Sequence, residues 1–360
     1  MEFEKILKKY RKIVDYNLNK FFNSKIKKVD NDFLRKSYGC LKEFSLRPGK
    51  RIRPISTIMA YKAIKDSNEK EIYPVSIVPE LIHASTLIHD DIMDEDKLRR
   101  GKPTAHKVFE KYFIKNFSEK KHKGNLFDSS SKRFSVSMAI VQGNMLYSMA
   151  ISSILKSKLD SDLKNKTLLI FEKAYNKTNE GQILDLVISA KEKSSLKDYE
   201  DVVIRKTALL LSSSIVFGAM LNNAKPYQLK YLEKYAICLG LAFQVRDDIM
   251  DLSKKSGKNR NIGTDIRKGN KTMIIIDALK KGKKLQKKFL LSILGKDNAT
   301  KKEIGKCVEI IKDAGSLNYA NSYANNKIKE AKRYLKEANL NEIGHEFFSN
   351  LADYVIKRKK

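Results

Sequence analysis

The sequence predicts an all-α protein, a single large helical bundle that spans residues 1–360. Apolar residues recur every three or four positions through most of the chain, which is the spacing of a buried helix face. No convincing stretch alternates apolar and polar residues in the manner of a β-strand. Glycine and proline, with 16 and 6 copies, are sparse and lie between the helical segments. At the usual helix length, such a chain forms about ten or more helices.

The helical segments can be placed along the chain from this spacing. The clearest are expected at residues 1–36, 54–64, 79–94, 226–251 and from 272 to the end. Pro79 and Pro226 each open one of them, because proline suits the first turn of a helix. Residues 113–134 are polar and contain a run of serines, so we expect a surface insertion there.

The charge of the chain bears on its partners. The formal net charge is +31, most of it from lysine. Such a charge suits anionic partners, namely diphosphate esters, an acidic membrane surface or nucleic acid, although lysine-rich solvated helix faces are an equally simple explanation. No nucleic-acid-binding motif occurs in the sequence. We therefore expect small diphosphates as partners, with peripheral membrane contact as an open alternative, and no nucleic acid.

The cysteines and the apolar runs indicate the compartment. Cys40, Cys238 and Cys307 are widely spaced and odd in number, so neither a disulfide framework nor a zinc site is expected. The first residues are charged and lack the apolar core of a signal peptide. The longest apolar run, residues 236–243, is too short to span a bilayer. These features favour a cytoplasmic protein, soluble or peripheral.

The helix that begins at Pro79 ends in a dense group of acids. Asp90, Asp91 and Asp94 lie within about one turn, at the helix end where the macrodipole disfavours negative charge. A basic stretch follows directly, with Lys97, Arg99, Arg100 and Lys102. Carboxylates beside a basic loop are typical of a site for metal-bridged phosphates, since Mg²⁺ binds one or two carboxylates together with water and phosphate oxygens. Alone, such a motif is more often a solvated surface.

The same five letters, DDIMD, return at residues 247–251, again at a helix end and again before a basic loop. Gln244, Asp247 and Asp251 are expected to share a face of that helix. The repetition favours the metal–phosphate interpretation over a solvated surface. Elsewhere, Lys206 and Thr207 are expected at the start of an apolar helix, where such groups are usually surface groups.

Taken in order, the motifs resemble those of the trans-isoprenyl (polyprenyl) diphosphate synthases, from about residue 42 to residue 278. GKRIRP at 49–54 is similar to the family's GKxxRP, and LIHDDIMDEDKLRRGKPTAH is similar to its first aspartate-rich motif with the arginine pair. The later motifs are matched by EGQILDL, RKT, AFQVRDDIMD and IGTDIRKGNKT. The first motif looks most like that of archaeal-type geranylgeranyl diphosphate synthases.

The resemblance implies the isoprenoid-synthase type of all-α fold, with a central cavity, and a homodimer. It implies a Mg²⁺-dependent prenyltransferase that condenses isopentenyl diphosphate with dimethylallyl, geranyl or farnesyl diphosphate. The implied metal ligands are Asp90, Asp94 and Asp247, with Asp91, Asp248 and Asp251 in support. The implied isopentenyl diphosphate site is Lys50, Arg53, His83 and Arg100. The implied allylic diphosphate site is Arg99, Lys206, Thr207, Gln244, Arg260 and Lys271, with Lys206 and Gln244 also assisting catalysis.

The chain departs from the family pattern in three places. The family usually has Gly-Lys just before GxDI, whereas Arg260 occupies the matching position here, with Lys258 nearby. Asn144 follows Gly143 where the family usually has aspartate. The third departure is the insertion at 113–134, which has no family counterpart.

The product length depends on the helix before Asp90. Ser85 and Thr86 lie about one turn before it and are small, so the growing tail should pass them and reach twenty carbons. Farnesyl or longer polyprenyl products remain alternatives. A terpene synthase and a non-catalytic partner subunit are further alternatives, but each tends to lack one aspartate-rich motif, and this chain keeps both.

Overall fold

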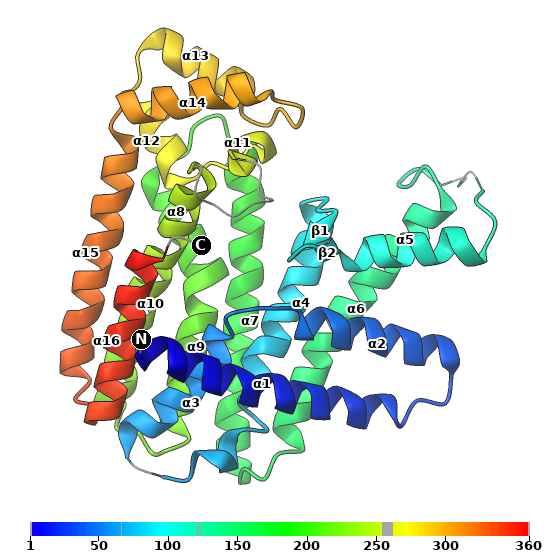
Figure 1. Cartoon of the computed structure of the whole chain (residues 1–360), viewed down its shortest axis with the longest axis vertical. Coiled ribbons are helices and arrows are strands. Elements are labelled where there is room, and N and C mark those ends of the chain that lie inside the picture. Colours follow the sequence, from blue (N-terminus) through cyan, green and yellow to red (C-terminus); the bar gives the residue numbers. More distant parts are fainter. Residues whose placement is uncertain (1, 66, 121, 123, 254–261, 359–360) are drawn as a thin grey trace. The chain divides into compact units, whose positions relative to one another are not determined.

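The computed structural model describes residues 2–65, 67–120, 122, 124–253 and 262–358. Most of this part of the chain is helical, which confirms the predicted all-α class (Figure 1). The described residues also contain one short antiparallel ribbon, β1 (Leu98–Arg99) and β2 (Lys102–Pro103), in which Leu98 pairs with Pro103.

The chain divides into two compact units, with boundaries inside α3, between Ser67 and Asn68, and inside α7. The first unit comprises Met1–Ile58 and Asn68–Leu169, and the second comprises Met59–Ser67 and Ile170–Lys360. The first contains the ribbon, α1 (Glu2–Ile26), α2 (Asp32–Leu46), part of α3 (Ile52–Ile64), the 3₁₀ turn η1 (Glu69–Ile72), α4 (Val78–Met93), α5 (Ala105–Asn116), α6 (Ser130–Leu155) and the start of α7 (Ser161–Ala190).

Helix α4 is the centre of the first unit. Pro79 lies in its first turn, as the sequence predicts, and Leu81, Ile82 and Ile88 are buried. The helix packs along α6, which in turn packs against α5. This packing fixes the last turn of α4, which carries the first group of acids.

The prediction of one helix over residues 1–36 is wrong, because the structure has two helices there. The side chain of Asn31 accepts a hydrogen bond from the Leu34 N–H at 2.9 Å and so begins α2. The apolar spacing continues across the break because α1 and α2 pack on each other and each has a buried face, with Leu18 on the first and Leu41 on the second.

The predicted insertion at 113–134 is too long. Helix α5 continues to Asn116 and α6 begins at Ser130, so the irregular part between them is residues 117–129, insofar as they are described. Phe113 packs against Phe117 and Phe134, with ring centroids 5.3 and 5.4 Å apart. Both ends of the segment therefore belong to an aromatic cluster of the first unit.

The second unit is organised around its longest central helix, α10. Its elements are the rest of α3 and of α7, α8 (Leu196–Val203), the π-helical turn η2 (Ile204–Ala208), α9 (Leu209–Met220), α10 (Pro226–Asp251), α11 (Thr264–Lys268), α12 (Met273–Lys281), α13 (Lys284–Ile293), α14 (Lys301–Asp313), α15 (Ser316–Glu337) and α16 (Glu342–Lys357). Helix α10 packs against α9, α15 and α16, and Leu239 and Val245 on it are buried. The Tyr235 hydroxyl donates to the Phe348 carbonyl at 2.6 Å and ties α10 to α16.

Residues Leu196–Met220 form one continuous helical run with a π-helical turn inside it. Lys206 and Thr207 lie in this turn, so their predicted place at the start of a helix is wrong. The turn lies very close to α10, because a Cβ added at Gly240 would be 2.5 Å from the Cβ of Ala208. π-Helical turns occur often at functional sites.

Two helical runs, Ser130–Leu155 and Leu196–Met220, are long and apolar enough to cross a membrane. Of their most apolar stretches, 39% and 61% respectively is buried inside the protein. A core helix of a globular protein satisfies the same criteria of length and composition, so these features are weak indications of a membrane span.

Candidate active-site pockets

The first group of acids lies at the end of α4, against the β1–β2 ribbon. The ribbon returns Arg99 towards the helix, and its guanidinium Nε donates to Asp91 Oδ1. Its Nη2 lies 3.5 Å from Asp90 Oδ2 and 3.6 Å from Asp96 Oδ2. Asp94 ends the helix, and its N–H donates to the Asp90 carbonyl at 2.8 Å. One arginine therefore lies against three carboxylates, and its single positive charge leaves an excess of negative charge.

The chemistry of this group fits Mg²⁺. Burial raises the pKa of Asp91 to about 6, although Arg99 opposes the rise. The second oxygen of Asp91, Oδ2, is buried and has no hydrogen-bond partner among the described residues. Within the described parts of the chain, no three His, Cys, Asp or Glu side chains are close enough together to hold a metal ion unaided. Mg²⁺ matches such a donor set, because it needs few carboxylates and accepts phosphate oxygens for the rest.

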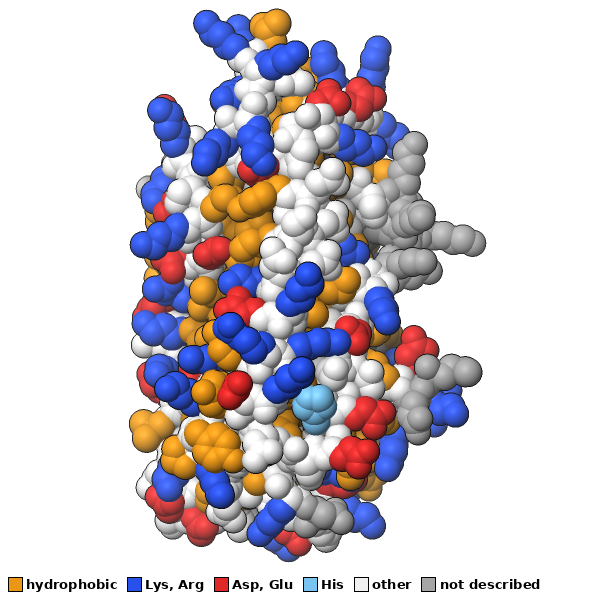
Figure 2. Space-filling model, turned by 90° about the vertical axis from the view of Figure 1, so that its left-hand side faces the viewer, with side chains coloured by type: hydrophobic (Ala, Val, Ile, Leu, Met, Phe, Trp, Pro, Cys, Tyr) orange, Lys and Arg blue, Asp and Glu red, His pale blue; other side chains and the backbone are white. Residues whose placement is uncertain are grey.

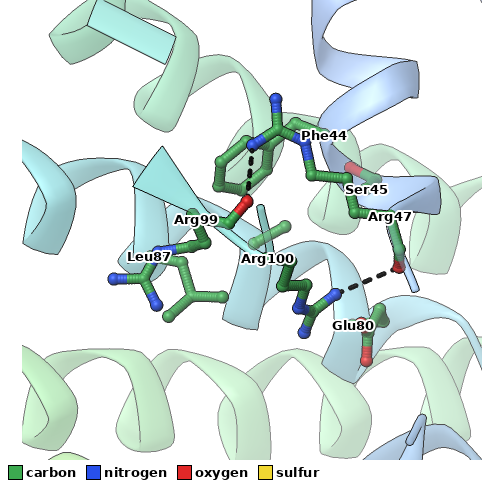
Figure 3. Close-up of a pocket in the computed structure, with 8 residues that line it drawn as sticks. Phe44, Ser45, Arg47, Glu80, Leu87, Arg99 and Arg100 are labelled. Atoms are coloured by element: carbon green, nitrogen blue, oxygen red, sulfur yellow. Dashed lines mark hydrogen bonds between the residues drawn. The ribbon is translucent and has the colours of Figure 1, made fainter. Parts of the chain in front are cut away.

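A basic pocket lies beside these acids in the first unit, and Figure 3 shows its residues. It is lined by Phe44, Ser45, Arg47, Glu80, Ala84, Leu87, Arg99 and Arg100. Arg47 Nη1 donates to the Arg99 carbonyl at 3.3 Å, and Arg100 Nη1 donates to the Arg47 carbonyl at 3.2 Å (Figure 3). The Arg100 guanidinium packs over Gly49, where an added Cβ would lie only 2.8 Å from Arg100 Nη1.

The other predicted isopentenyl diphosphate ligands belong to the same unit. Arg53 opens α3, and its Nε is buried with no hydrogen-bond partner among the described residues. Burial, and then the charges of Arg53 and Arg100, hold the pKa of His83 well below its usual value. His83 is therefore a neutral imidazole that can donate one N–H to a phosphate. Lys50 lies exposed on the loop between α2 and α3.

The second unit contains a cavity of about 140 Å³. Its lining residues come from α7, α8, η2, α10, α11 and the loop after α11, and are Asp185, Ile188, Tyr199, Val202, Val203, Lys206, Thr207, Gln244, Asp248, Asp265, Asn270, Lys271 and Thr272. Four residues predicted to bind the allylic diphosphate, Lys206, Thr207, Gln244 and Lys271, thus share one cavity. The two other members of that predicted set are Arg99, in the first unit, and Arg260, which together with Lys258 lies outside the described residues.

Hydrogen bonds hold the polar groups of this cavity in place. Lys206 Nζ donates to Asp185 Oδ2 at 2.7 Å. The Thr207 hydroxyl donates to Gln244 Oε1 at 3.3 Å, and Gln244 Nε2 donates to Asp248 Oδ1 at 3.0 Å. A lysine, a hydroxyl, an amide and carboxylates are thereby presented together.

Among the lining residues that were not predicted as ligands are Asp185, Tyr199 and Asp265. The Tyr199 hydroxyl donates to Asp248 Oδ2 at 2.6 Å. Burial and the nearby carboxylate of Asp265 raise the pKa of Asp248 to about 8, and burial raises the pKa of Asp265 to about 6. A buried pair of carboxylates whose charges repel is stabilised by a divalent cation. The GTDI sequence signalled Asp265, and the segment EGQILDL signalled Asp185.

Asp247 and Asp251 have different surroundings from Asp248. The carboxylate of Asp251 accepts the N–H groups of Thr264 at 3.2 Å and Asp265 at 3.0 Å, and so holds the start of α11. Asp247 forms an ion pair with Arg358, whose guanidinium lies 4.0 Å from the ring centroid of Phe243. Among the described residues that line the cavity, the second DDIMD motif is represented by Asp248 alone.

An all-α fold with two DDIMD helix ends, one beside a basic pocket and one beside a lysine-containing cavity, defines a prenyltransferase. The chain belongs to the polyprenyl synthetase family, whose model matches residues 36–311. The resemblance found in the sequence is thereby confirmed.

Individual relatives agree with this assignment. The chain is 37% identical over 295 residues to a short chain isoprenyl diphosphate synthase of Methanocaldococcus jannaschii, with 81% of this chain and 80% of the relative covered. It is 30% identical over 357 residues to a geranylgeranyl diphosphate synthase of Saccharolobus solfataricus, with 96% and 99% covered. The crystal structure of a geranylgeranyl pyrophosphate synthetase from Pyrococcus horikoshii is similar at a TM-score of 0.82 and 28% identity, over 99% of this chain and 98% of that one.

Proposed function

We propose that this prenyltransferase condenses isopentenyl diphosphate with dimethylallyl, geranyl or farnesyl diphosphate, depends on Mg²⁺, and makes geranylgeranyl diphosphate as its main product. The observation that carries the proposal is the repeated DDIMD motif. Each copy ends a helix, and each lies in a unit that also presents buried or pocket-lining cationic groups. The relative from Saccharolobus solfataricus, which is named for this product, matches nearly the whole chain.

The proposed roles are those that the family resemblance implies; Arg99, Lys206 and Lys271 line the two pockets, whereas Asp90, Asp94 and Asp247 are not among the described lining residues. In the first unit, Asp90 and Asp94 would hold Mg²⁺, Asp91 would support them, and Arg99 would bind a phosphate of the allylic substrate. In the second unit, Asp247 would hold Mg²⁺, and the cations Lys206 and Lys271 would bind the allylic diphosphate. Bound Mg²⁺ supplies positive charge that stabilises the leaving diphosphate. Residues of this chain that hold the same oxygens act in the same direction.

The reaction needs no nucleophile from the protein. Loss of diphosphate leaves an allylic carbocation, the isopentenyl double bond attacks it, and a proton is lost to the released diphosphate. Thr207 and Gln244 are hydrogen-bonded at 3.3 Å, so the amide dipole beside the cation is held in one orientation. His83 stays neutral and serves as a hydrogen-bond donor to isopentenyl diphosphate rather than as a base.

Product length is assigned to the segment of α4 that precedes Asp90. Ser85 is fully buried, whereas Thr86 is partly exposed and its hydroxyl donates to the His83 carbonyl at 2.9 Å. Thr86 is therefore the better candidate for the wall of the product channel. Neither residue is bulky, which favours a twenty-carbon product over farnesyl diphosphate.

Incubation with labelled isopentenyl diphosphate, each allylic primer and Mg²⁺ tests the proposal. Chromatography of the dephosphorylated products should show geranylgeraniol, and Asp90→Asn or Asp247→Asn should lower turnover by orders of magnitude. Asp353→Asn, which removes a partly exposed partner of Lys332, is the matched control. Full activity in EDTA would refute the dependence on Mg²⁺. Farnesol or longer alcohols as the main product would refute the product assignment.

We also propose a homodimer. Helix α7 exposes Ile183, Leu186 and Val187 at helical spacing, with 61%, 53% and 44% of their surfaces accessible. Light scattering coupled to size-exclusion chromatography should give twice the mass of the 41.3 kDa chain. Replacement of Ile183 and Leu186 by lysine should give the monomer mass. A wild-type monomer at micromolar concentration would contradict the proposal.

We also propose that the protein is cytoplasmic and makes peripheral contact with membranes. On the face drawn in Figure 2, lysine and arginine side chains are scattered among acidic and hydrophobic ones. A diffuse positive charge attracts anionic lipid weakly and over a wide area. Sedimentation with phosphatidylglycerol vesicles at low salt should recover the protein, and 0.5 M salt should release it. Equal recovery with neutral phosphatidylcholine would argue against this contact.

A further inference from the structure

The loop between α2 and α3 has an unusual backbone at Arg51. Its φ of 52° lies in the left-handed region, which residues with a Cβ seldom adopt. Such a conformation is unfavourable and persists only where the surrounding structure imposes it, and it occurs preferentially at functional sites. Arg100, at the basic pocket of the same unit, has a φ of 54°. The contacts that hold Arg51 in this conformation therefore bear on the geometry of the basic pocket.

The side chain of Arg51 is buried and fully engaged by the protein. Its Nε donates to Asp15 Oδ1 at 2.8 Å, its Nη1 donates to Glu80 Oε1, and its Nη2 donates to the Arg47 carbonyl at 3.0 Å. Only 1% of the side chain is exposed. Because the side chain is buried and each of its three nitrogens donates to the protein, Arg51 joins α1, the end of α2 and α4 rather than facing a ligand.

Glu80 is the one carboxylate among the described residues that line the basic pocket. Figure 3 shows it below Arg100, and its side chain is 7% exposed. Because Glu80 is paired with Arg51, the guanidinium groups of Arg53 and Arg100 keep an excess of positive charge for an anion. Arg51 and Arg100 also share an acceptor, the Arg47 carbonyl, at 3.0 and 3.2 Å. A shift of Arg51 would therefore move the group that orients Arg100.

We propose that Arg51 and Glu80 are positioning residues, whose ion pair fixes the 47–53 segment against α4 and so sets the places of Lys50, Arg53 and Arg100 for the diphosphate of isopentenyl diphosphate. This inference rests on the proposed function, because that function assigns the ligand. The inference goes beyond the proposed function because it names two residues that act through other residues and do not touch the substrate.

The test compares two Michaelis constants. Glu80→Gln keeps the size of the side chain and removes its charge, so the KM for isopentenyl diphosphate should rise about tenfold, the loss expected for one charge-assisted hydrogen bond. The KM for the allylic substrate should change less than about twofold, because four of its proposed ligands, Lys206, Thr207, Gln244 and Lys271, line the cavity of the second unit. Arg51→Lys should also raise the KM for isopentenyl diphosphate, because an ammonium group cannot reproduce the three contacts of the guanidinium. The double variant Arg51→Gln with Glu80→Gln should resemble either single variant, as expected for partners in one contact.

Controls separate this inference from folding and from the proposed function. Asp277→Asn removes a buried carboxylate that pairs with Lys281 at 2.9 Å in the second unit, and it should leave both KM values unchanged. Asp15→Asn removes the more exposed partner of Arg51 and should raise the same KM by a smaller factor. Calorimetry with isopentenyl diphosphate in EDTA gives a second readout that needs no turnover. A wild type that binds but makes no prenyl product would refute the proposed function alone. Unchanged or tighter binding by Glu80→Gln would refute the positioning role, whatever the turnover.

Discussion

Gly181 allows helix α7 to pass unusually close to the π-helical turn that carries Lys206. A Cβ at Gly181 would lie 2.5 Å from the backbone nitrogen of Lys206 and 2.9 Å from its Cα. Ordinary van der Waals contact begins near 3.4 Å, so Gly181→Ala must separate the two backbones by about 1 Å. Backbone atoms cannot rotate away as a flexible side chain could. The substitution should therefore disturb the cavity of the second unit.

The effect on stability and the effect on turnover should differ in size. Overpacking costs about 1–3 kcal/mol. Alanine gains about 1 kcal/mol over glycine inside a helix. The net loss in the free energy of unfolding is therefore at most about 2 kcal/mol. The hydrogen bond from Lys206 Nζ to Asp185 Oδ2, 2.7 Å long, joins the same two elements, the π-helical turn and α7. Misplacement of a site by about 1 Å can lower turnover about a hundredfold, so kcat/KM should fall more than stability does.

Urea denaturation and steady-state kinetics test both expectations on the same protein samples. Gly305→Ala in α14 is the matched control, because nothing lies within 4 Å of the added Cβ. That control should gain about 1 kcal/mol and keep its turnover. If Gly181→Ala is stabilised like the control and remains fully active, the close approach has no functional importance and the reasoning is wrong.

Three further predictions follow from the first unit. Thr86→Phe should shorten the main product by at least one isoprene unit, seen by chromatography of the dephosphorylated alcohols. Ser85→Phe should instead cost about 1–3 kcal/mol, because Ser85 is fully buried and a larger side chain would overpack its surroundings. Since the pKa of His83 is lowered in the folded state, the unfolded state binds the proton first, and stability should fall as the pH drops below 6.5. His83→Gln should reduce that slope in urea titrations by up to about 1.4 kcal/mol per pH unit, and an unchanged slope would contradict the assignment. Deletion of residues 118–128 should leave cooperative thermal unfolding intact, because it spares Phe117 and the aromatic cluster; a loss of cooperativity would show that the segment packs into the unit.

The sequence predicted those parts of the site that depend on local pattern. The ends of α4 and α10 were placed correctly because apolar spacing and the DDIMD letters both lie within single helices. Helix α11 has only five residues, and its first N–H groups are held by Asp251, thirteen positions before Thr264. A contact of that kind depends on tertiary folding and cannot be read from spacing. Gly263 and Gly269, both at positive φ, were the available signal for its ends.

Pairings between charged groups were equally hard to predict. Arg99 was predicted as a phosphate ligand, and the structure adds that its guanidinium already pairs with Asp91. The contact of Asp247 with Arg358 joins residues more than a hundred positions apart. In a chain with 73 basic residues, sequence alone offers too many equivalent partners for each carboxylate.

The π-helical turn at Ile204–Ala208 has a consequence for the helix that follows it. Such a turn holds one residue more than an α-helical turn, and one residue corresponds to a rotation of about 100° around the axis. The side of α9 that carries Leu210 and Phe217, both buried, is thus set by the length of this turn. Deletion of a single residue within it would restore a regular helix and rotate these apolar side chains away from the core. The length of the turn thereby determines both the rotation of α9 about its axis and the position of Lys206, so that a change in one changes the other.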